Sequence, residues 1–113
     1  MSLSQVEYLK HIRDEIEYLI THSRSLSLNT FLSDNTLQRS FVRSLEIIGE
    51  ATKKLSTDFK SKYPEVEWKV IAGTRDKLIH DYFGVDYELV WDIITSKIPV
   101  LKKQIDNILR HER

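Results

Sequence analysis

The sequence predicts an all-α fold, an up-and-down bundle of four long helices in which the last helix is kinked near Pro99. Glycine and proline are scarce, with 3 and 2 residues in a chain of 113, which favours long helices over a sheet with many turns. Apolar residues recur at three- and four-residue spacing in successive segments, and no segment alternates with a period of two over strand length. Residues 1–113 are therefore expected to form a single domain, large enough for one core and too short for two.

The composition narrows the class of protein. Hydrophobic residues make up 41% of the chain and charged residues 30%, as in ordinary soluble globular proteins. The absence of cysteine removes disulfides and thiolate chemistry and fits a reducing compartment, so we expect a cytoplasmic protein. No signal peptide and no membrane span are predicted. The formal net charge of zero argues against a broad nucleic-acid surface but is compatible with a small cationic cleft.

The first helix is predicted to begin at a capping box, in which the Ser4 oxygen accepts from the N3 amide and Glu7 reaches back to the cap. It should end where polar residues compete for the backbone at 23–25. Residues 26–35 are expected to form a connection.

The second helix is predicted to begin within the cap-rich segment 33–36 and to end near Asp58 or Phe59. Arg43, Glu46 and Glu50 lie off its apolar face. They fit a solvated face with pairs such as Arg43–Glu46. Alternatively, one carboxylate, with Glu46 as the candidate, orients a catalytic side chain.

The third helix is expected from about Glu67 to Phe83, after a linker over 60–64 and with Gly84 in the C′ position. Asp86 can cap the fourth helix. Pro99 lies inside the fourth apolar run, where it removes a backbone donor and clashes with the preceding turn, so a kink is predicted near Thr95 or Ser96.

The third helix has an arginine at the centre of its apolar stripe. On a wheel of about 100° per residue, the apolar positions all fall within about 60° of Arg75: Trp68, Ile71, Ala72, Leu78, Ile79 and Tyr82. Arginine is almost never fully buried unless it is paired. Arg75 is therefore expected to meet an internal carboxylate, such as Glu46, Glu50 or Asp76, or a ligand phosphate.

Asp76 and His80 are four residues apart and share one flank of this stripe. His80 can act as an acid or a base near neutral pH, and Asp76 could fix its tautomer. Arginine plus histidine without a metal cluster suits phosphodiester cleavage in RNA, where one residue moves a proton and the other stabilises charge on phosphorus. A structural ion pair would show the same pattern. His80 lies about 140° from Arg75, so two copies facing each other across a two-fold axis would converge better than one.

The spacing of Arg75, His80 and Tyr82 resembles the Arg-x4-His-x-Tyr motif of the HEPN superfamily. More closely, the chain is similar to the HepT-like toxins, which are partners of minimal nucleotidyltransferase (MNT) antitoxins. Residues 44–51 resemble the helix-two signature of that family, and residues 68–84 and 90–93 resemble its third and fourth helices.

This resemblance implies a homodimeric, metal-independent and cofactor-free endoribonuclease toxin of a type VII-like toxin–antitoxin pair. By the resemblance, Arg75 and His80 would be catalytic, and Asp76 would stand where the family often has asparagine. Tyr82 would receive AMP from the MNT partner, which silences the toxin. Two other interpretations stay open, a non-catalytic helical module that partners a nucleotidyltransferase and a plain structural bundle.

Overall fold

The computed structural model describes residues 4–80 and 84–112, without the side chains of Arg75, Ile79 and His80. Every regular element in these two ranges is helical, which confirms the predicted all-α class. The elements in chain order are α1 (Gln5–Ser23), α2 (Leu28–Leu32), α3 (Asn35–Lys54), α4 (Thr57–Ser61), α5 (Trp68–His80), α6 (Tyr87–Asp92), the π-helical turn η1 (Ile93–Lys97) and α7 (Ile98–His111).

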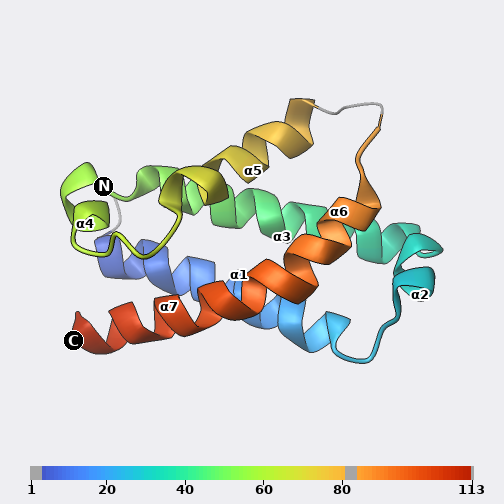
Figure 1. Cartoon of the computed structure of the whole chain (residues 1–113), viewed down its shortest axis with the longest axis horizontal. Coiled ribbons are helices and arrows are strands. Elements are labelled where there is room, and N and C mark those ends of the chain that lie inside the picture. Colours follow the sequence, from blue (N-terminus) through green and yellow to red (C-terminus); the bar gives the residue numbers. More distant parts are fainter. Residues whose placement is uncertain (1–3, 81–83, 113) are drawn as a thin grey trace.

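The long helices pack side by side as a bundle (Figure 1). The helix α3 packs against both α1 and α5, and α1 also packs against α7. The short helix α2 contacts α6 at one end of the bundle, and α4 lies at the other end, near the C-terminal end of α7 (Figure 1). The helices α6, η1 and α7 follow one another as a single long, bent path. The predicted bundle of four long helices is therefore confirmed.

The core is formed by the apolar faces of α1, α3 and α7, together with aromatic residues at the α2 end. The rings of Phe31 and Phe41 stack with centroids 5.3 Å apart, and Trp91 packs on Phe31 at the same centroid distance. Fully burying one large apolar side chain contributes about 1.5–3 kcal/mol. The largest side chains with almost no exposure are Phe31, Phe41, Leu9, Ile12, Ile16, Leu19, Ile48, Ile94, Ile105 and Ile108.

Three helices begin at side chains that the sequence predicts as N-caps. Ser4 and Glu7 form the predicted capping box, with both hydrogen bonds present at the start of α1. Asp34 accepts from the Leu37 amide at 3.0 Å, and Asp86 accepts from the Leu89 amide at 3.1 Å. Each cap satisfies an amide that would otherwise lack a helical partner.

The predicted connection over 26–35 is wrong in one respect, because it contains the helix α2. The Ser27 side chain caps this turn by accepting from the Thr30 amide at 3.2 Å. The buried Gln38 side chain then donates to the carbonyls of Phe31 and Leu32, at 3.1 and 3.0 Å. Those two carbonyls lie at the end of α2, where no further helical turn supplies amides to bond them.

The predicted end of the second helix near Asp58 or Phe59 is also wrong, because α3 ends at Lys54. Leu55 is extended, with φ −68° and ψ 140°, and its side chain is buried. Ser56 then accepts from the Phe59 amide at 3.1 Å and starts the separate helix α4. The residues expected to form a linker over 60–64 therefore begin inside a helix.

The predicted kink before Pro99 is confirmed as the π-helical turn η1. The Ile98 amide donates to the Ile93 carbonyl, five residues back, and Pro99 occupies the first turn of α7. Proline suits a first turn because its missing amide would have no helical partner there. A single-turn π-bulge bends the helix, so α6 and α7 follow different directions.

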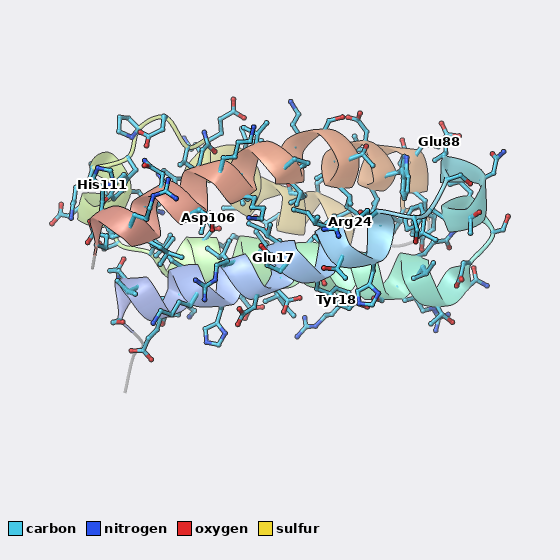
Figure 2. All side chains as sticks on the ribbon, turned by 90° about the horizontal axis from the view of Figure 1, so that it is seen from below. Glu17, Tyr18, Arg24, Glu88, Asp106 and His111 are labelled. Carbon is cyan, nitrogen blue, oxygen red and sulfur yellow. The ribbon has the colours of Figure 1, made fainter. Side chains whose placement is uncertain are left out.

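Two polar clusters join distant parts of the chain. Lys102 of α7 bridges Glu17 of α1 at 3.3 Å and Asp106 at 2.9 Å, with both acids visible between these helices in Figure 2. The hydrogen bond to Asp106 is the main cause of the raised pKa of Lys102. Just beyond the end of α7, the Tyr63 hydroxyl donates to Glu112, which also pairs with Lys62 at 2.9 Å.

Within residues 4–80 and 84–112, no helix combines the length and the apolar character needed to cross a membrane.

Candidate functional site

The helix α5, which carries the Arg75–His80 segment, is anchored at its first residue. The indole nitrogen of Trp68 donates to the carbonyls of Lys60 and Tyr63, at 3.2 and 3.0 Å, and the side chain is buried. A buried indole that has found its acceptors fixes both its own helix and the preceding segment. The start of α5 is therefore held rigidly against the end of α4.

The apolar stripe of α5 faces the core, as the sequence predicts. Trp68 and Leu78 are buried, Ile71 and Ala72 are half-buried, and α5 packs along α3. The helix includes positions 75 and 80, while Tyr82 lies outside the described residues. The expected end of the helix at Phe83 also falls outside them.

Asp76 forms an ion pair that the sequence analysis missed. Lys53 Nζ of α3 lies 2.7 and 2.9 Å from the two carboxylate oxygens of Asp76. The carboxylate expected to orient His80 is therefore also bound to a lysine from the neighbouring helix. Its place in the sequence could not indicate this partner, because the two residues are 23 positions apart and meet only when α3 and α5 pack.

Glu46, the second supporting residue, pairs with Arg43 at 3.4 Å on the surface of α3. Arg43 is exposed, Glu46 is half-buried, and Glu50 is exposed. These contacts match the interpretation as a solvated helix face. An ion pair three residues apart on a helix surface contributes only a few tenths of a kcal/mol.

An open apolar groove runs along one flank of α5. Its volume is about 520 Å³, with Leu45 and Ile48 of α3 among its lining residues and with η1 and α7 on the side opposite α5. Val70 of α5 and Val100 of α7, which also line the groove, have exposed fractions of 63% and 56%. Exposed apolar side chains lining one groove are a common mark of an interaction surface.

The other flank of α5 borders a hollow of about 450 Å³, here called the lysine hollow. It is lined by Lys53, Thr57, Lys60, Ser61, Trp68, Lys69 and Ala72. Three cations from α3, α4 and α5 thus surround one depression, with hydroxyl groups beside them. The sequence analysis missed this hollow because its lysines lie on three different helices, which meet only in the folded chain.

The helical geometry relates both features to position 80. Counting about 100° per residue from Arg75, Lys69 and Asp76 fall near 120° and 100°, on the side of the lysine hollow. Gly73 and Lys77, which line the groove, fall near 160° and 200°. Position 80, near 140°, therefore belongs to the strip of α5 between the groove and the hollow.

The sequence was compared with known protein families and proteins. The family model described as "Ribonuclease HepT-like" matches residues 9–108. The protein named "Putative RNase TTE0752" of Caldanaerobacter subterraneus is 52% identical over 106 residues, which cover 94% of this chain and 95% of that protein. "Putative RNase MJ0127" of Methanocaldococcus jannaschii is 44% identical, over 91% of this chain and 85% of its own.

"Probable ribonuclease HepT" of Thermococcus cleftensis is 41% identical over 108 residues, which cover 96% of this chain and 98% of that protein. No solved structure matches the chain. The family match and these relatives span nearly the whole helical domain, including the helix that carries Arg75 and His80. The chain belongs to the HepT-like ribonuclease family of the HEPN superfamily.

Proposed function

We propose that this chain is a metal-independent endoribonuclease that cuts RNA with Arg75 and His80. The observation that carries the proposal is the Arg-x4-His spacing on the single helix α5, in a chain that belongs to a ribonuclease family. The names of the relatives, which describe RNases, support the same substrate class.

The proposed chemistry uses the 2′-hydroxyl of RNA as the nucleophile. His80 moves one proton, either removing it from this hydroxyl or giving it to the leaving 5′-oxygen, and water exchanges the other proton. The 2′-oxygen attacks phosphorus, the bond from phosphorus to the 5′-oxygen breaks, and the products are a 2′,3′-cyclic phosphate and a 5′-hydroxyl. Arg75 stabilises the negative charge that develops on the phosphoryl oxygens. DNA lacks the 2′-hydroxyl and is not a substrate for this reaction.

We further propose that two copies form the active unit, with their α5 segments bordering a shared cleft. Positions 75 and 80 lie about 140° apart on one helix, so residues from two chains would converge on a phosphate more readily. The apolar groove beside α5 supports this arrangement, because Val70 and Val100 leave unburied apolar surface next to the motif. A second copy would remove this surface from water, which favours association.

The regulation that we propose acts at Tyr82 through a small nucleotidyltransferase partner. Transfer of AMP from ATP to the tyrosine hydroxyl, with release of pyrophosphate, would place a phosphodiester and an adenosine close to the motif. A single residue separates Tyr82 from His80 in the sequence, so the added group would compete with the RNA phosphate for the same cations.

The test is cleavage of a 5′-labelled RNA by the purified chain. Arg75→Ala and His80→Ala are each expected to abolish cleavage while keeping the helical circular dichroism spectrum. The matched controls Arg39→Ala and His11→Ala, both at exposed positions, should cut like the unaltered chain. Loss of cleavage in EDTA that is restored by a divalent ion would contradict the mechanism. Unfolding by Arg75→Ala would identify the arginine as a structural partner instead.

A non-catalytic binding module is the second candidate. The exposed Val70 and Val100 favour it, since an apolar groove can dock a partner protein without any chemistry. A chain that binds its nucleotidyltransferase partner tightly but leaves RNA intact at high enzyme concentration would support this second function.

A further inference from the structure

We propose that the lysine hollow holds backbone phosphates of the RNA substrate a few nucleotides from the cleaved bond. This inference rests on the proposed ribonuclease function and adds a substrate-binding site to it. The hollow is a concave surface on which Lys53, Lys60 and Lys69 come together from three different helices.

The lining of the hollow matches a phosphate chain. The described residues that line it include no carboxylate, and the exposed Thr57 and Ser61 add hydroxyl groups beside the lysines. Phosphate oxygens accept hydrogen bonds from lysine ammonium groups and from serine or threonine hydroxyls. The set therefore has the donors that an RNA backbone needs, and the neighbouring carboxylate of Asp76 is paired with Lys53.

Two of the three cations are available for a ligand. Lys60 and Lys69 make no ion pair within the described part of the chain, while Lys53 is paired with Asp76 at 2.7 Å. The chain as a whole has no net charge. A positive potential at this hollow is therefore local and would guide an anionic strand to one place instead of to the whole surface.

Trp68 fixes the spacing of the backbone segments that carry Lys60 and Lys69. Its indole nitrogen donates to the Lys60 carbonyl at 3.2 Å, and Lys69 is the next residue along α5. The backbone positions of Lys60 and Lys69 are thus held relative to each other through one buried side chain. Binding to a preorganised pair of cations costs less conformational entropy than binding to two independent ones.

The hollow leads along α5 toward position 80. Lys69 and position 80 differ by only about 20° around the helix and by about 16 Å along it. One strand of a stacked nucleic acid carries a phosphate about every 3.4 Å, so this length corresponds to roughly five nucleotides. An RNA that has its cleaved phosphate at His80 would reach the hollow within that distance.

The test measures binding without cleavage, in the full chain with His80→Ala. Fluorescence anisotropy compares a 12-nucleotide single-stranded RNA with a trinucleotide. Adding Lys60→Ala and Lys69→Ala to the His80→Ala chain should weaken its binding of the 12-mer about tenfold or more at low salt. The preference of the protein for the 12-mer over the trinucleotide should fall as well. The salt slope should fall by about 1.4, from about 0.7 for each lysine–phosphate contact on a single strand. The matched control Lys10→Ala with Lys103→Ala removes two exposed lysines from α1 and α7 and should change neither quantity.

The outcomes separate this site from the proposed activity. If the chain with His80 intact cuts RNA, but loss of Lys60 and Lys69 leaves 12-mer affinity and salt slope unchanged, the hollow is not an RNA site while the ribonuclease stands. If loss of the two lysines weakens binding of the 12-mer but no form of the chain cuts RNA, the hollow is an RNA-binding site and the proposed ribonuclease activity is wrong. If their loss weakens only the complex with an acidic partner protein, the RNA assignment is overturned.

Discussion

Lys53 and Asp76 form an ion pair that joins the last turn of α3 to the middle of α5, with the lysine nitrogen 2.7 and 2.9 Å from the two carboxylate oxygens. Both side chains are nearly half exposed, at 42% and 45%. Water and salt therefore screen their attraction, and such pairs contribute about 0.2–1 kcal/mol. The contact holds Asp76 on the flank of α5 that also includes position 80.

A double-mutant cycle should show that this pair adds little to stability. We expect Lys53→Met and Asp76→Asn to have a coupling energy below about 1 kcal/mol in urea unfolding, and the coupling should shrink in 1 M salt. Lys54→Met, at an exposed position next to Lys53, serves as the control and should show no coupling to Asp76→Asn. A coupling energy of several kcal/mol would contradict this prediction and show that the pair is a main contributor to the packing of α5 on α3.

The contacts of Glu112 should make stability depend on pH at both extremes. Hydrogen bonds from Tyr63 and then Lys62 lower the pKa of Glu112 below its ordinary value of 4.5. The same Tyr63–Glu112 bond, followed by burial, raises the pKa of Tyr63 to about 12 from 10.0. The contribution of Glu112 is present above pH 4.5 and lost as the pH falls through its lowered pKa. The contribution of Tyr63 is present below pH 10 and lost as the pH rises toward 12.

The measurement for this cluster is denaturant unfolding of the unaltered chain and of Glu112→Gln across pH. We expect the unaltered chain to be more stable from about pH 5 to pH 10, with the two curves converging outside that window. Glu15→Gln, which lies on α1, provides a carboxylate control. A stability difference that is constant from pH 3 to pH 11 would mean that ionisation of this cluster does not support the fold.

Oligomeric state should respond to a charge in the apolar groove. The unaltered chain is expected to sediment as a dimer, at twice its 13.4 kDa mass, at micromolar concentration. Val70→Glu places a charge where a second copy would bury the side chain, so it should shift the population to monomer. Leu28→Glu, which is partly exposed at the α2 end and outside the groove, should remain dimeric. If the unaltered chain sediments as a monomer, both the proposed dimer and the shared cleft are contradicted.

The features that the sequence predicts correctly have causes within a few residues of chain. The Ser4–Glu7 capping box, the Asp86 cap and the bend before Pro99 each follow from one or two side chains acting on their own turn. The apolar faces of the long helices follow from a fixed period of 3.6 residues. Neither kind of inference needs the position of another helix.

The features that the sequence missed depend on packing or on competition between weak local signals. The extended Leu55 ends one helix and Ser56 starts another, yet the apolar spacing continues through Leu55 and Phe59. The Lys53–Asp76 pair and the lysine hollow exist only because α3, α4 and α5 meet. The roles of Arg75 and His80 rest on the motif and the family, since the described residues do not include their side chains.

The last prediction concerns Tyr82 as the site of AMP transfer. Tyr82 lies outside the described residues; the sequence expectation of a helix that continues to Phe83 would put it about 20° from Arg75 and two turns further along. Each attached AMP adds a phosphodiester with about one negative charge, which would occupy the cation that the RNA phosphate needs. Incubation with the cognate nucleotidyltransferase and ATP should therefore add one or more AMP units at Tyr82 and stop RNA cleavage. Intact-mass and peptide mass spectrometry locate the adduct, and a gel assay follows the labelled RNA.

The variant Tyr82→Phe separates modification from a structural role of the same residue. A tyrosine on an apolar stripe is commonly a core residue with its hydroxyl at the edge, and phenylalanine preserves that packing. The variant should therefore fold, cut RNA and stay active after incubation with the partner and ATP. Tyr18→Phe, at an exposed position on α1, should be silenced like the unaltered chain. Because the partner can also inhibit by binding, the same incubation without ATP is needed. Inhibition of Tyr82→Phe that requires ATP would mean that another hydroxyl receives the AMP.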